Sequence, residues 1–279
     1  MFLVCYNIYM IKKIKIKPDE EMLKHWVNTL IPPYDVFFFQ ELSNIDVIDK
    51  NLITTKKYIQ TFSDITYINA YEHWSVKNNS KFVYIDYKNN LLSNENIRDY
   101  IYKQQIKCCR GLILQDKTII SNWLFNTLTY NNKKNLTIKY AKEIDDWYGY
   151  INEKIPSHIK KIANKFVKFD GCNCLSTTIY AVSKNNDILL QWMTENEFLI
   201  KLKELNYQKV EGTYRNNDVV VFKNKSKIIH ACYCIDEELF LNKSGQSRFN
   251  PIVLLPINDI KKDWNNCKIE VYRKMSVAL

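Results

Sequence analysis

Glycine and proline are scarce in this chain, at five and six of 279 residues. Linkers between domains are commonly rich in one or the other, so the composition argues against long linkers. The sequence contains no run of 18 apolar residues, and a helix needs about that many to span a membrane. The basic residues from Lys12 to Lys17 follow the apolar start of the chain, whereas a secretory signal has the opposite order. We therefore expect a soluble cytoplasmic protein.

The composition is that of a folded protein with a basic surface. Hydrophobic residues make up 46% of the chain and aromatic residues 14%, which suits a globular protein. The net charge is +10, with 20 basic and 16 acidic residues in 1–150 and 20 and 14 in 151–279. Because the charge is spread, a solvated lysine-rich surface explains it better than a nucleic-acid site. Such a surface would also attract an acidic carrier protein that delivers an acyl group.

The eight cysteines include two Cys-x-Cys pairs, at 172–174 and 232–234. Close spacing of this kind is typical of a reducing compartment and unlike a disulfide framework. Residues 1–150 contain two of the four histidines, His25 and His73, each followed by a tryptophan. We interpret both histidines as packed or surface residues rather than ligands.

Apolar and β-branched patterns predict an α/β arrangement for residues 1–150, of a type that the patterns do not identify. Pro18 and Asp19 open one predicted helix, and Ser93 can cap another. The predicted strands are 11–17, 34–42, 57–68, 81–87 and 112–115, the predicted helices are 18–30 and 93–106, and 119–128 and 136–150 are ambiguous or helical.

Residues 151–279 predict a helical part followed by a strand meander. Pro156 opens a short helix, and Thr194–Glu197 forms a capping box that opens another. Gly212 ends this helical part. The predicted strands are Asp218–Lys223, Ile228–Ile235, Leu239–Lys243 and Ile269–Arg273.

The chain is organised around residues 169–182, which read FDGCNCLSTTIYAV. A turn at Asp170–Gly171 comes first, and apolar residues three and four positions apart then mark one face of a helix. Cys174 lies on the first turn of that helix, where the positive end of the macrodipole favours the thiolate. A thiolate is a nucleophile, but it still needs a proton acceptor and an orienting group.

His230 and Asn242 are the candidates for these two groups. His230 lies near the start of one predicted strand, and Asn242 lies twelve residues later on the next. Neighbouring antiparallel strands with a tight turn place such residues side by side, so Asn242 can hold one ring nitrogen. A helix packed across the sheet would bring Cys174 Sγ to the imidazole. The sequence thus predicts the catalytic order Cys, His, Asn.

These residues resemble the NlpC-type cysteine peptidases, circularly rearranged relatives of papain. That family has a cysteine at a helix start, a strand that begins Gly-Asp-Leu/Val-Val-Phe-Phe and a strand that begins His-Val-Gly-Ile-Tyr. A third polar residue lies about twelve positions after the histidine. The matching segments here are NDVVVF at 217–222 and HACYCI at 230–235, followed by Asn242.

The resemblance covers roughly the last 130 residues and implies an α+β protein. Residues 151–279 would form a papain-like, NlpC-like catalytic domain, in which the nucleophile helix packs on an antiparallel sheet. Residues 1–150 would form a separate α/β region, whose role the resemblance does not address.

The chain departs from the family pattern around the nucleophile. The usual Asp-Cys-Ser-Gly is NCLS at 173–176, and the usual third histidine is Asn242, as in papain-like enzymes. Lys168 replaces the glutamine that papain-like enzymes place six residues before the nucleophile. The expected oxyanion donors are therefore the backbone N–H of Cys174 and, as a weaker candidate, the side chain of Asn173.

Two local alternatives stay open. Cys172 could be the nucleophile, but it lies in the turn, so Cys174 at the helix start is favoured. His230, Cys232 and Cys234 share one strand face and could hold zinc together with Cys172 or Cys174. Structural zinc sites prefer Cys-x2-Cys spacing, so we favour packing cysteines and no metal. Four residues after Asn242 are interpreted as a solvated loop rather than as a lining of the substrate cleft: Lys243, Gln246, Arg248 and Asn250.

The expected function is acyl transfer through an acyl-Cys174 intermediate, without a cofactor. Most hydrolases of the resembled family act on cell-wall peptides outside the membrane, and this chain shows no export signal. We therefore expect an amide synthase or acyltransferase of small-molecule biosynthesis, whose acyl donor is a small molecule, a peptide or an acidic carrier protein. We expect no membrane or nucleic-acid partner. The alternatives are a cysteine amidase or peptidase and, further off, a non-catalytic binding module or zinc-binding protein.

Overall fold

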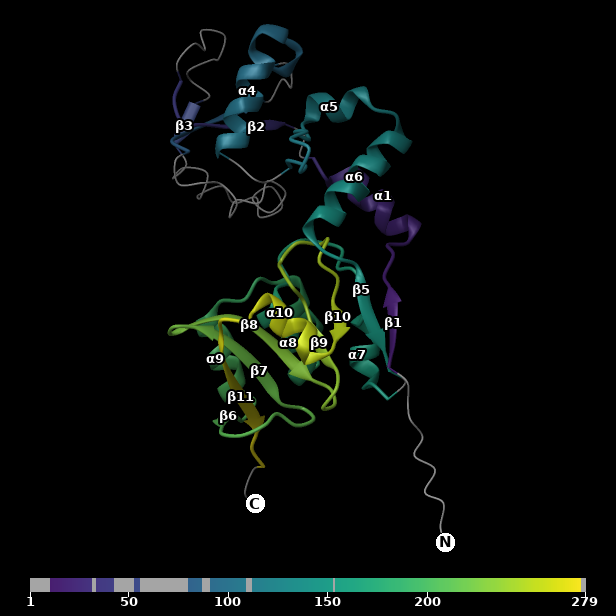
Figure 1. The fold of residues 1–279 in the computed structure, drawn as a ribbon, viewed down its shortest axis with the longest axis vertical. Helices are drawn as coiled ribbons and strands as arrows, with labels where there is room; N and C mark the ends of the chain where they lie inside the picture. The colour runs from purple at the N-terminus through teal and green to yellow at the C-terminus, as the bar shows by residue number, and fades with distance from the viewer. Residues whose placement is uncertain are drawn as a thin grey trace. The chain divides into compact units, whose positions relative to one another are not determined.

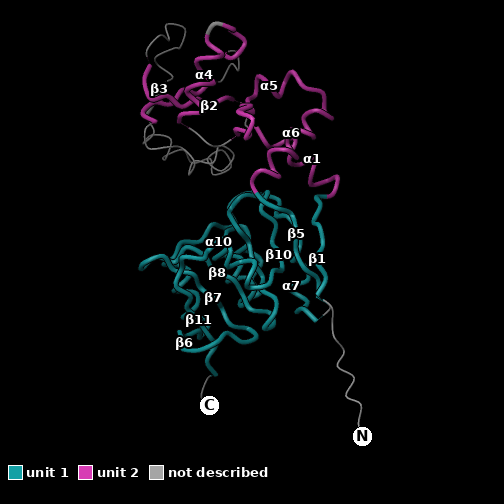
Figure 2. Tube along the Cα trace, in the orientation of Figure 1, with its two compact units in different colours: residues 1–18, 145–279 teal, residues 19–144 magenta. Residues whose placement is uncertain are grey.

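The computed structural model describes residues 11–31, 34–42, 53–55, 80–86, 91–108, 112–152 and 154–276. The predicted strand at 57–68 and His73 lie outside these residues. The chain is a mixed α+β protein with two compact units, residues 1–18 with 145–279 (unit 1) and residues 19–144 (unit 2) (Figure 2). None of the described helices has the length and apolar character needed to cross a membrane.

Unit 2 holds a three-stranded antiparallel sheet in the order β2-β4-β3 (Figure 1). Its elements are β2 (Asp35–Phe39), β3 (Ile53–Thr55), β4 (Phe82–Asp86), α1 (Glu20–Thr29), α4 (Glu95–Cys108), α5 (Asn122–Thr127) and α6 (Tyr130–Ile144). The side chain of Gln105 on α4 donates to Phe38 O at 2.9 Å and accepts from Phe38 N at 3.0 Å. This side chain satisfies backbone groups that the edge strand β2 would otherwise leave unpaired.

Unit 1 is built on a six-stranded antiparallel sheet in the order β10-β9-β8-β7-β11-β6 (Figure 1). The strands are β6 (Tyr207–Val210), β7 (Val219–Asn224), β8 (Lys227–Cys234), β9 (Phe240–Asn242), β10 (Val253–Leu255) and β11 (Lys268–Lys274). Its helices are α7 (Ser157–Ile162), α8 (Cys174–Ser183), α9 (Glu195–Glu204) and α10 (Ile257–Asp263). A separate two-stranded sheet pairs β1 (Lys12–Lys15) with β5 (Tyr148–Ile151), which brings residues 11–18 into this unit.

Both faces of the six-stranded sheet are buried, against different helices. Ala231 of β8 belongs to an apolar cluster that includes Ile179 of α8. The next residue, Cys232, belongs to a second cluster that includes Ile260 of α10. Because strand side chains alternate between faces, a residue's position on β8 decides which helix it meets. We call the two sides the α8 face and the α10 face.

The central strands and the capping box confirm what the sequence predicted for residues 151–279. Strands β7, β8, β9 and β11 lie within one or two residues of their predicted bounds. Thr194 Oγ1 accepts from Glu197 N, and Glu197 in turn accepts from Thr194 N, so α9 opens with the predicted box. Sequence patterns missed β6, β10 and α10, which are short and lack alternation. The ambiguous stretch 136–150 divides between the end of α6 and the start of β5.

Candidate active site

The start of α8 is fixed by a capping box at Asn173. Asn173 Oδ1 accepts from Ser176 N at 2.9 Å, and Ser176 Oγ accepts from Asn173 N at 2.9 Å. Gly171, with φ of +125°, makes the turn that leads into the helix, a conformation that favours glycine. Cys174 is therefore the first helical residue. The N–H groups of Cys174 and Leu175 have no intrahelical partner, and both lie close enough to the thiol to lower its pKa.

The thiol of Cys174 also meets the edge of β8. Strand β9 pairs with only the last two residues of β8, so among the described residues no strand lies beside the rest of that edge. Cys234 N donates to Asp218 O on the β7 side, and alternate residues point the other way. The N–H of Ala231 therefore projects from the open edge, where it faces Cys174 Sγ and lowers the pKa of the thiol.

His230 lies on the α10 face, two residues before Cys232. Its Nε2 is 2.7 Å from Asn242 Oδ1. A carbonyl oxygen only accepts, so Nε2 carries the proton and Nδ1 keeps its lone pair. The ring stacks on Trp264 at 4.8 Å between centroids and lies 5.5 Å from the ring of Phe222. Within the described part of the chain, Nδ1 is buried and has no hydrogen-bond partner.

The structure brings two of the three predicted catalytic residues into contact. His230 and Asn242 pair across neighbouring strands, in the manner that their spacing predicted. Cys174 Sγ makes no hydrogen bond to the imidazole, because His230 projects onto the α10 face while α8 covers the other. The sulfur instead meets the backbone of Ala231, the residue next to His230 in the chain.

Burial sets the protonation of both groups. Desolvation raises the pKa of the Cys174 thiol, although nearby N–H groups and the charge of Lys243 act in the opposite direction. Desolvation lowers the pKa of His230 to about 4, against the opposing effect of its bond to Asn242. The N–H groups at the helix start do lower the thiol pKa, as the sequence predicted, but desolvation outweighs them and the pKa lies above its ordinary value. Near pH 7 the site holds a neutral thiol and a neutral imidazole.

Known proteins give no further guide to this site. Comparison of the chain with protein-family models, with curated proteins and with solved structures found no match. The geometry of the site itself is therefore the basis for assigning a function.

Asn173 and Cys172, the other two candidates beside the nucleophile, are both engaged in local structure. Asn173 Nδ2 donates to Met193 O at 2.8 Å while its Oδ1 caps the helix, so both ends of this side chain are engaged. Cys172 is 1% exposed, and its Sγ lies 3.3 Å from Thr177 Oγ1. Cys174 is partly exposed, which makes it the more accessible of the two thiols.

Cys232 and Cys234 pack in the apolar cluster on the α10 face. Burial raises the pKa of both thiols, that of Cys234 to about 12. Among the described residues, no group of three or more His, Cys, Asp or Glu side chains is arranged to hold a metal ion.

The segment after Asn242 is not the solvated loop that the sequence suggested. Lys243 is fully buried and Arg248 is 2% exposed. Asn250 is also buried, and its Nδ2 donates to Asp145 Oδ2 at 2.8 Å. Sequence reasoning missed this burial. One cue was available, since the residue after Asn242 on an alternating strand must point toward the opposite face.

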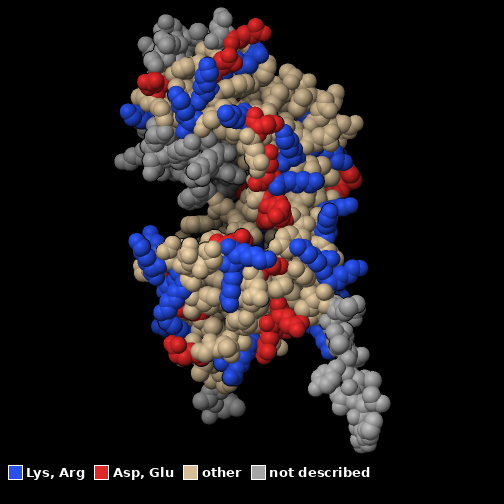
Figure 3. All heavy atoms as spheres, in the orientation of Figure 1, with Lys and Arg blue, Asp and Glu red and all other residues tan. Residues whose placement is uncertain are grey.

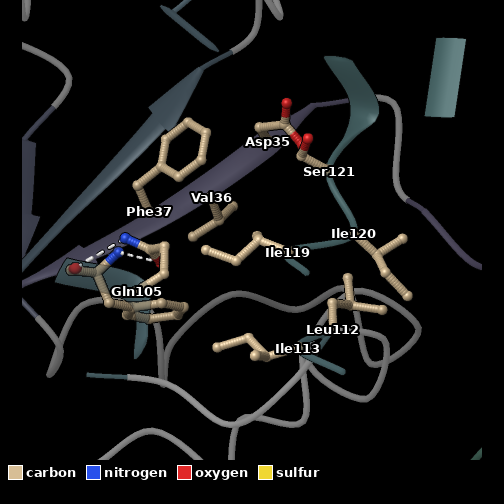
Figure 4. Close-up of a pocket in the computed structure, with 10 residues that line it drawn as sticks. Asp35, Val36, Phe37, Gln105, Leu112, Ile113, Ile119, Ile120 and Ser121 are labelled. Carbon is tan, nitrogen blue, oxygen red and sulfur yellow. Dashed lines mark hydrogen bonds between the residues drawn. The ribbon is translucent and has the colours of Figure 1, made fainter. Parts of the chain in front are cut away.

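Two hollows lie away from this site. Figure 4 shows the one in unit 2, where Asp35 and Ser121 lie beside the apolar side chain of Ile119. Burial raises the pKa of Asp35 to about 6, but the cavity of about 20 Å³ has room for little more than one water molecule. A larger hollow of about 890 Å³ lies in unit 1 near the C-terminal end of α8, where His158 and Arg215 line it. It lacks both Cys174 and His230.

Proposed function

We propose that this protein is a cysteine-nucleophile acyl-transfer enzyme with a papain-like, NlpC-type catalytic domain in unit 1. In this proposal Cys174 is the nucleophile, His230 is the general base and Asn242 orients the ring. One observation carries the proposal: Asn242 fixes Nε2 of His230 while Nδ1 keeps a free, buried lone pair. A buried polar atom without a partner costs about 1–3 kcal/mol, and a role as proton acceptor would account for its retention.

The proposed reaction has two halves. Cys174 Sγ attacks the carbonyl carbon of an amide or thioester, and the thiol proton passes round the open edge of β8 to His230 Nδ1, because the resting structure holds no hydrogen bond between the two side chains. The bond from that carbon to the leaving group breaks, and the leaving group takes the proton from Nδ1. In the second half an acceptor amine attacks the acyl carbon and gives its proton to Nδ1. The bond from carbon to Sγ then breaks, and the sulfur recovers the proton.

Backbone N–H groups supply the proposed oxyanion site. Those of Cys174 and Leu175 lie at the helix start without intrahelical partners, and that of Ala231 projects from the open edge of β8. All three lie close enough to Sγ to lower the thiol pKa, so they surround the sulfur to which the tetrahedral carbon of the intermediate would be bonded. The proposal assigns oxyanion binding to these groups and leaves Asn173 as the helix cap.

The burial of the base supports an amine rather than water as the acceptor. The ring of His230 has no exposed surface and is covered by Trp264. An enzyme that forms amides must keep water away from its acyl intermediate. Figure 3 shows Lys and Arg side chains interspersed with Asp and Glu on the face drawn, and a spread of positive charge suits an acidic carrier of the acyl group. Hydrolysis of an amide by the same residues is the competing reading.

Trapping the intermediate tests the proposal. The protein is incubated with a panel of acyl thioesters, and its intact mass is recorded for the wild type, Cys174→Ala and Cys172→Ala. We expect an acyl adduct in the wild type and Cys172→Ala but none in Cys174→Ala. An adduct that survives in Cys174→Ala, or no adduct with any donor in the panel, would end the proposal.

A competition experiment then separates transfer from hydrolysis. The acylated protein is mixed with a series of primary amines in buffered water, and the products are quantified by mass spectrometry. Transfer predicts that the amide product dominates at millimolar amine. Free acid as the main product at every amine concentration would assign the protein to the amidase class instead.

A further inference from the structure

Lys243 is a buried lysine, which is rare in folded proteins. It follows Asn242 in the chain, so its side chain leaves β9 toward the α8 face while Asn242 points to His230. The ammonium donates to Gly245 O at 2.5 Å and to Ser247 O at 2.8 Å. These two bonds use two of its three protons.

Three of the four groups that face the ammonium belong to the nucleophile segment, residues 169–182. The four groups are the thiols of Cys172 and Cys174 and the carboxylates of Asp170 and Asp145. Burial lowers the pKa of Lys243 to about 8, and the negative charge available on these four groups acts in the opposite direction. The side chain is therefore mostly cationic at pH 7. Its charge is in turn one of the influences that lower the pKa of Cys174.

Hydrogen bonds join the loop that follows Lys243 to the turn that precedes Cys174. Gly171 N donates to Gln246 O at 2.9 Å, and Arg248 N donates to Asp170 Oδ1 at 2.7 Å. Arg248 Nε also lies 3.7 Å from Asp170 Oδ2. The loop after Lys243 and the turn that precedes Cys174 are thus joined directly. A displacement of either would move the ammonium relative to the sulfur.

We propose that Lys243 is a positioning residue that stabilises the Cys174 thiolate as the thiol proton leaves for His230. This inference rests on the proposed function. The lysine transfers no proton. Its fixed positive charge lies in the same dry interior as the sulfur, where opposite charges attract more strongly than in water. Two neighbouring residues of the chain, Asn242 and Lys243, then serve the base and the nucleophile from opposite faces of one strand.

The rate of Cys174 alkylation by iodoacetamide between pH 6 and pH 10 tests this role, because only the thiolate reacts. Fragment mass spectrometry separates modification of Cys174 from that of Cys172. We expect Lys243→Gln and Lys243→Met to react about tenfold more slowly at pH 7.5, and the difference from the wild type to narrow above pH 8 as Lys243 in the wild type loses its charge. A purely structural role would keep the difference constant at every pH or leave the whole profile unchanged, and either result would overturn the proposal.

Lys243→Arg provides the test if the neutral variants fail to fold by circular dichroism. Arginine keeps its charge at every pH used, whereas Lys243 loses its own from about pH 8. We expect the arginine variant to match the wild type at pH 7 and to react about threefold faster at pH 9. An arginine profile that coincides with the wild type throughout would contradict the inference.

Two controls separate the effect of Lys243 on Cys174 from other influences on the thiol. Lys223→Gln removes another lysine of the same sheet, one that pairs with Glu270, and should leave the profile unchanged. The series is repeated in a His230→Ala background, since His230 is the proposed base, and in a Cys232→Ser background, since Cys232 is a titratable group near the thiol. Alkylation needs no acyl donor, so it reports on Lys243 even if no acyl adduct ever forms.

Discussion

Two buried polar side chains, one on each face of the six-stranded sheet, differ in their hydrogen bonding. On the α8 face, Lys243 finds two carbonyl acceptors and a set of facing thiols and carboxylates. On the α10 face, His230 finds one acceptor, Asn242, and keeps its second nitrogen unpartnered beneath Trp264. A group that only stabilises the fold is expected to be fully satisfied. The comparison singles out His230 Nδ1 as a buried acceptor that the described residues leave unused.

The largest expected effect comes from removing the unpartnered nitrogen. We expect His230→Ala to slow acylation of Cys174 by about 10³-fold, within the range of general-base catalysis. Single-turnover kinetics with an acyl thioester, read by intact mass, measures the rate. His158→Ala is the matched control, since His158 is the other histidine of unit 1 and bonds Ala181 O. Equal losses of acylation rate in His230→Ala and His158→Ala would contradict a specific role for His230.

Loss of the orienting residue should have a smaller effect. We expect Asn242→Ala to slow acylation by about 10- to 100-fold, because the ring can rotate and Nε2–H loses its acceptor. Asn242→Asp should instead raise the pKa of His230 and move the acid limb of the pH–rate profile upward. Rates recorded from pH 4 to pH 9 test both. A profile that stays in place in Asn242→Asp would show that the pair does not act as described.

The free energy of unfolding should fall as the pH is lowered, because His230 binds a proton more readily in the unfolded chain. The folded pKa of His230, about 4, lies below its ordinary value of 6.5, so the unfolded chain binds the proton first. Stability is therefore lost as the pH drops from about 6.5 toward 4, by about 3 kcal/mol at most. Urea unfolding at pH 7 and pH 4.5 measures it. The loss should be smaller in His230→Ala, and an equal loss in that variant would assign the effect to other groups.

The smallest expected effect concerns the cover over the ring. We expect Trp264→Leu to raise the pKa of His230 toward its ordinary value and to increase the free-acid product a few-fold relative to amide, since water gains access. Product ratios at fixed amine concentration measure this. Phe249→Leu is the control, because Phe249 is a buried aromatic residue of the same unit, whose ring lies beside the Arg248 guanidinium. Unchanged ratios in Trp264→Leu would mean that the stacked ring plays no part in excluding water.

The sequence was most informative where a short repeat or a local hydrogen bond decides the structure. The pairing of His230 with Asn242 follows from alternation on two strands joined by a tight turn. The position of Cys174 follows from the turn at Gly171 and the capping box after it. Each depends on residues that are close in the chain.

Contacts that depend on which face a helix covers were beyond these patterns. Sequence spacing placed Cys174 against the ring of His230, but α8 covers the face that the ring does not share. The cover by Trp264 joins segments more than thirty positions apart and leaves no periodic pattern. The burial of Lys243 depends on a loop that folds back over it, and loop paths are not encoded in periodicity.

The short length of β9 has a consequence for how such a protein is redesigned. Its register with β8 sets Leu241 opposite Tyr233, so a first further pair would join Asn242 to Cys232 and a second would join Lys243 to Ala231. The pair with Ala231 would engage the Ala231 N–H in a backbone hydrogen bond and make Lys243 part of β9. Lengthening a strand ordinarily stabilises a sheet. Here the added backbone hydrogen bond would replace the contact between the Ala231 N–H and Cys174 Sγ.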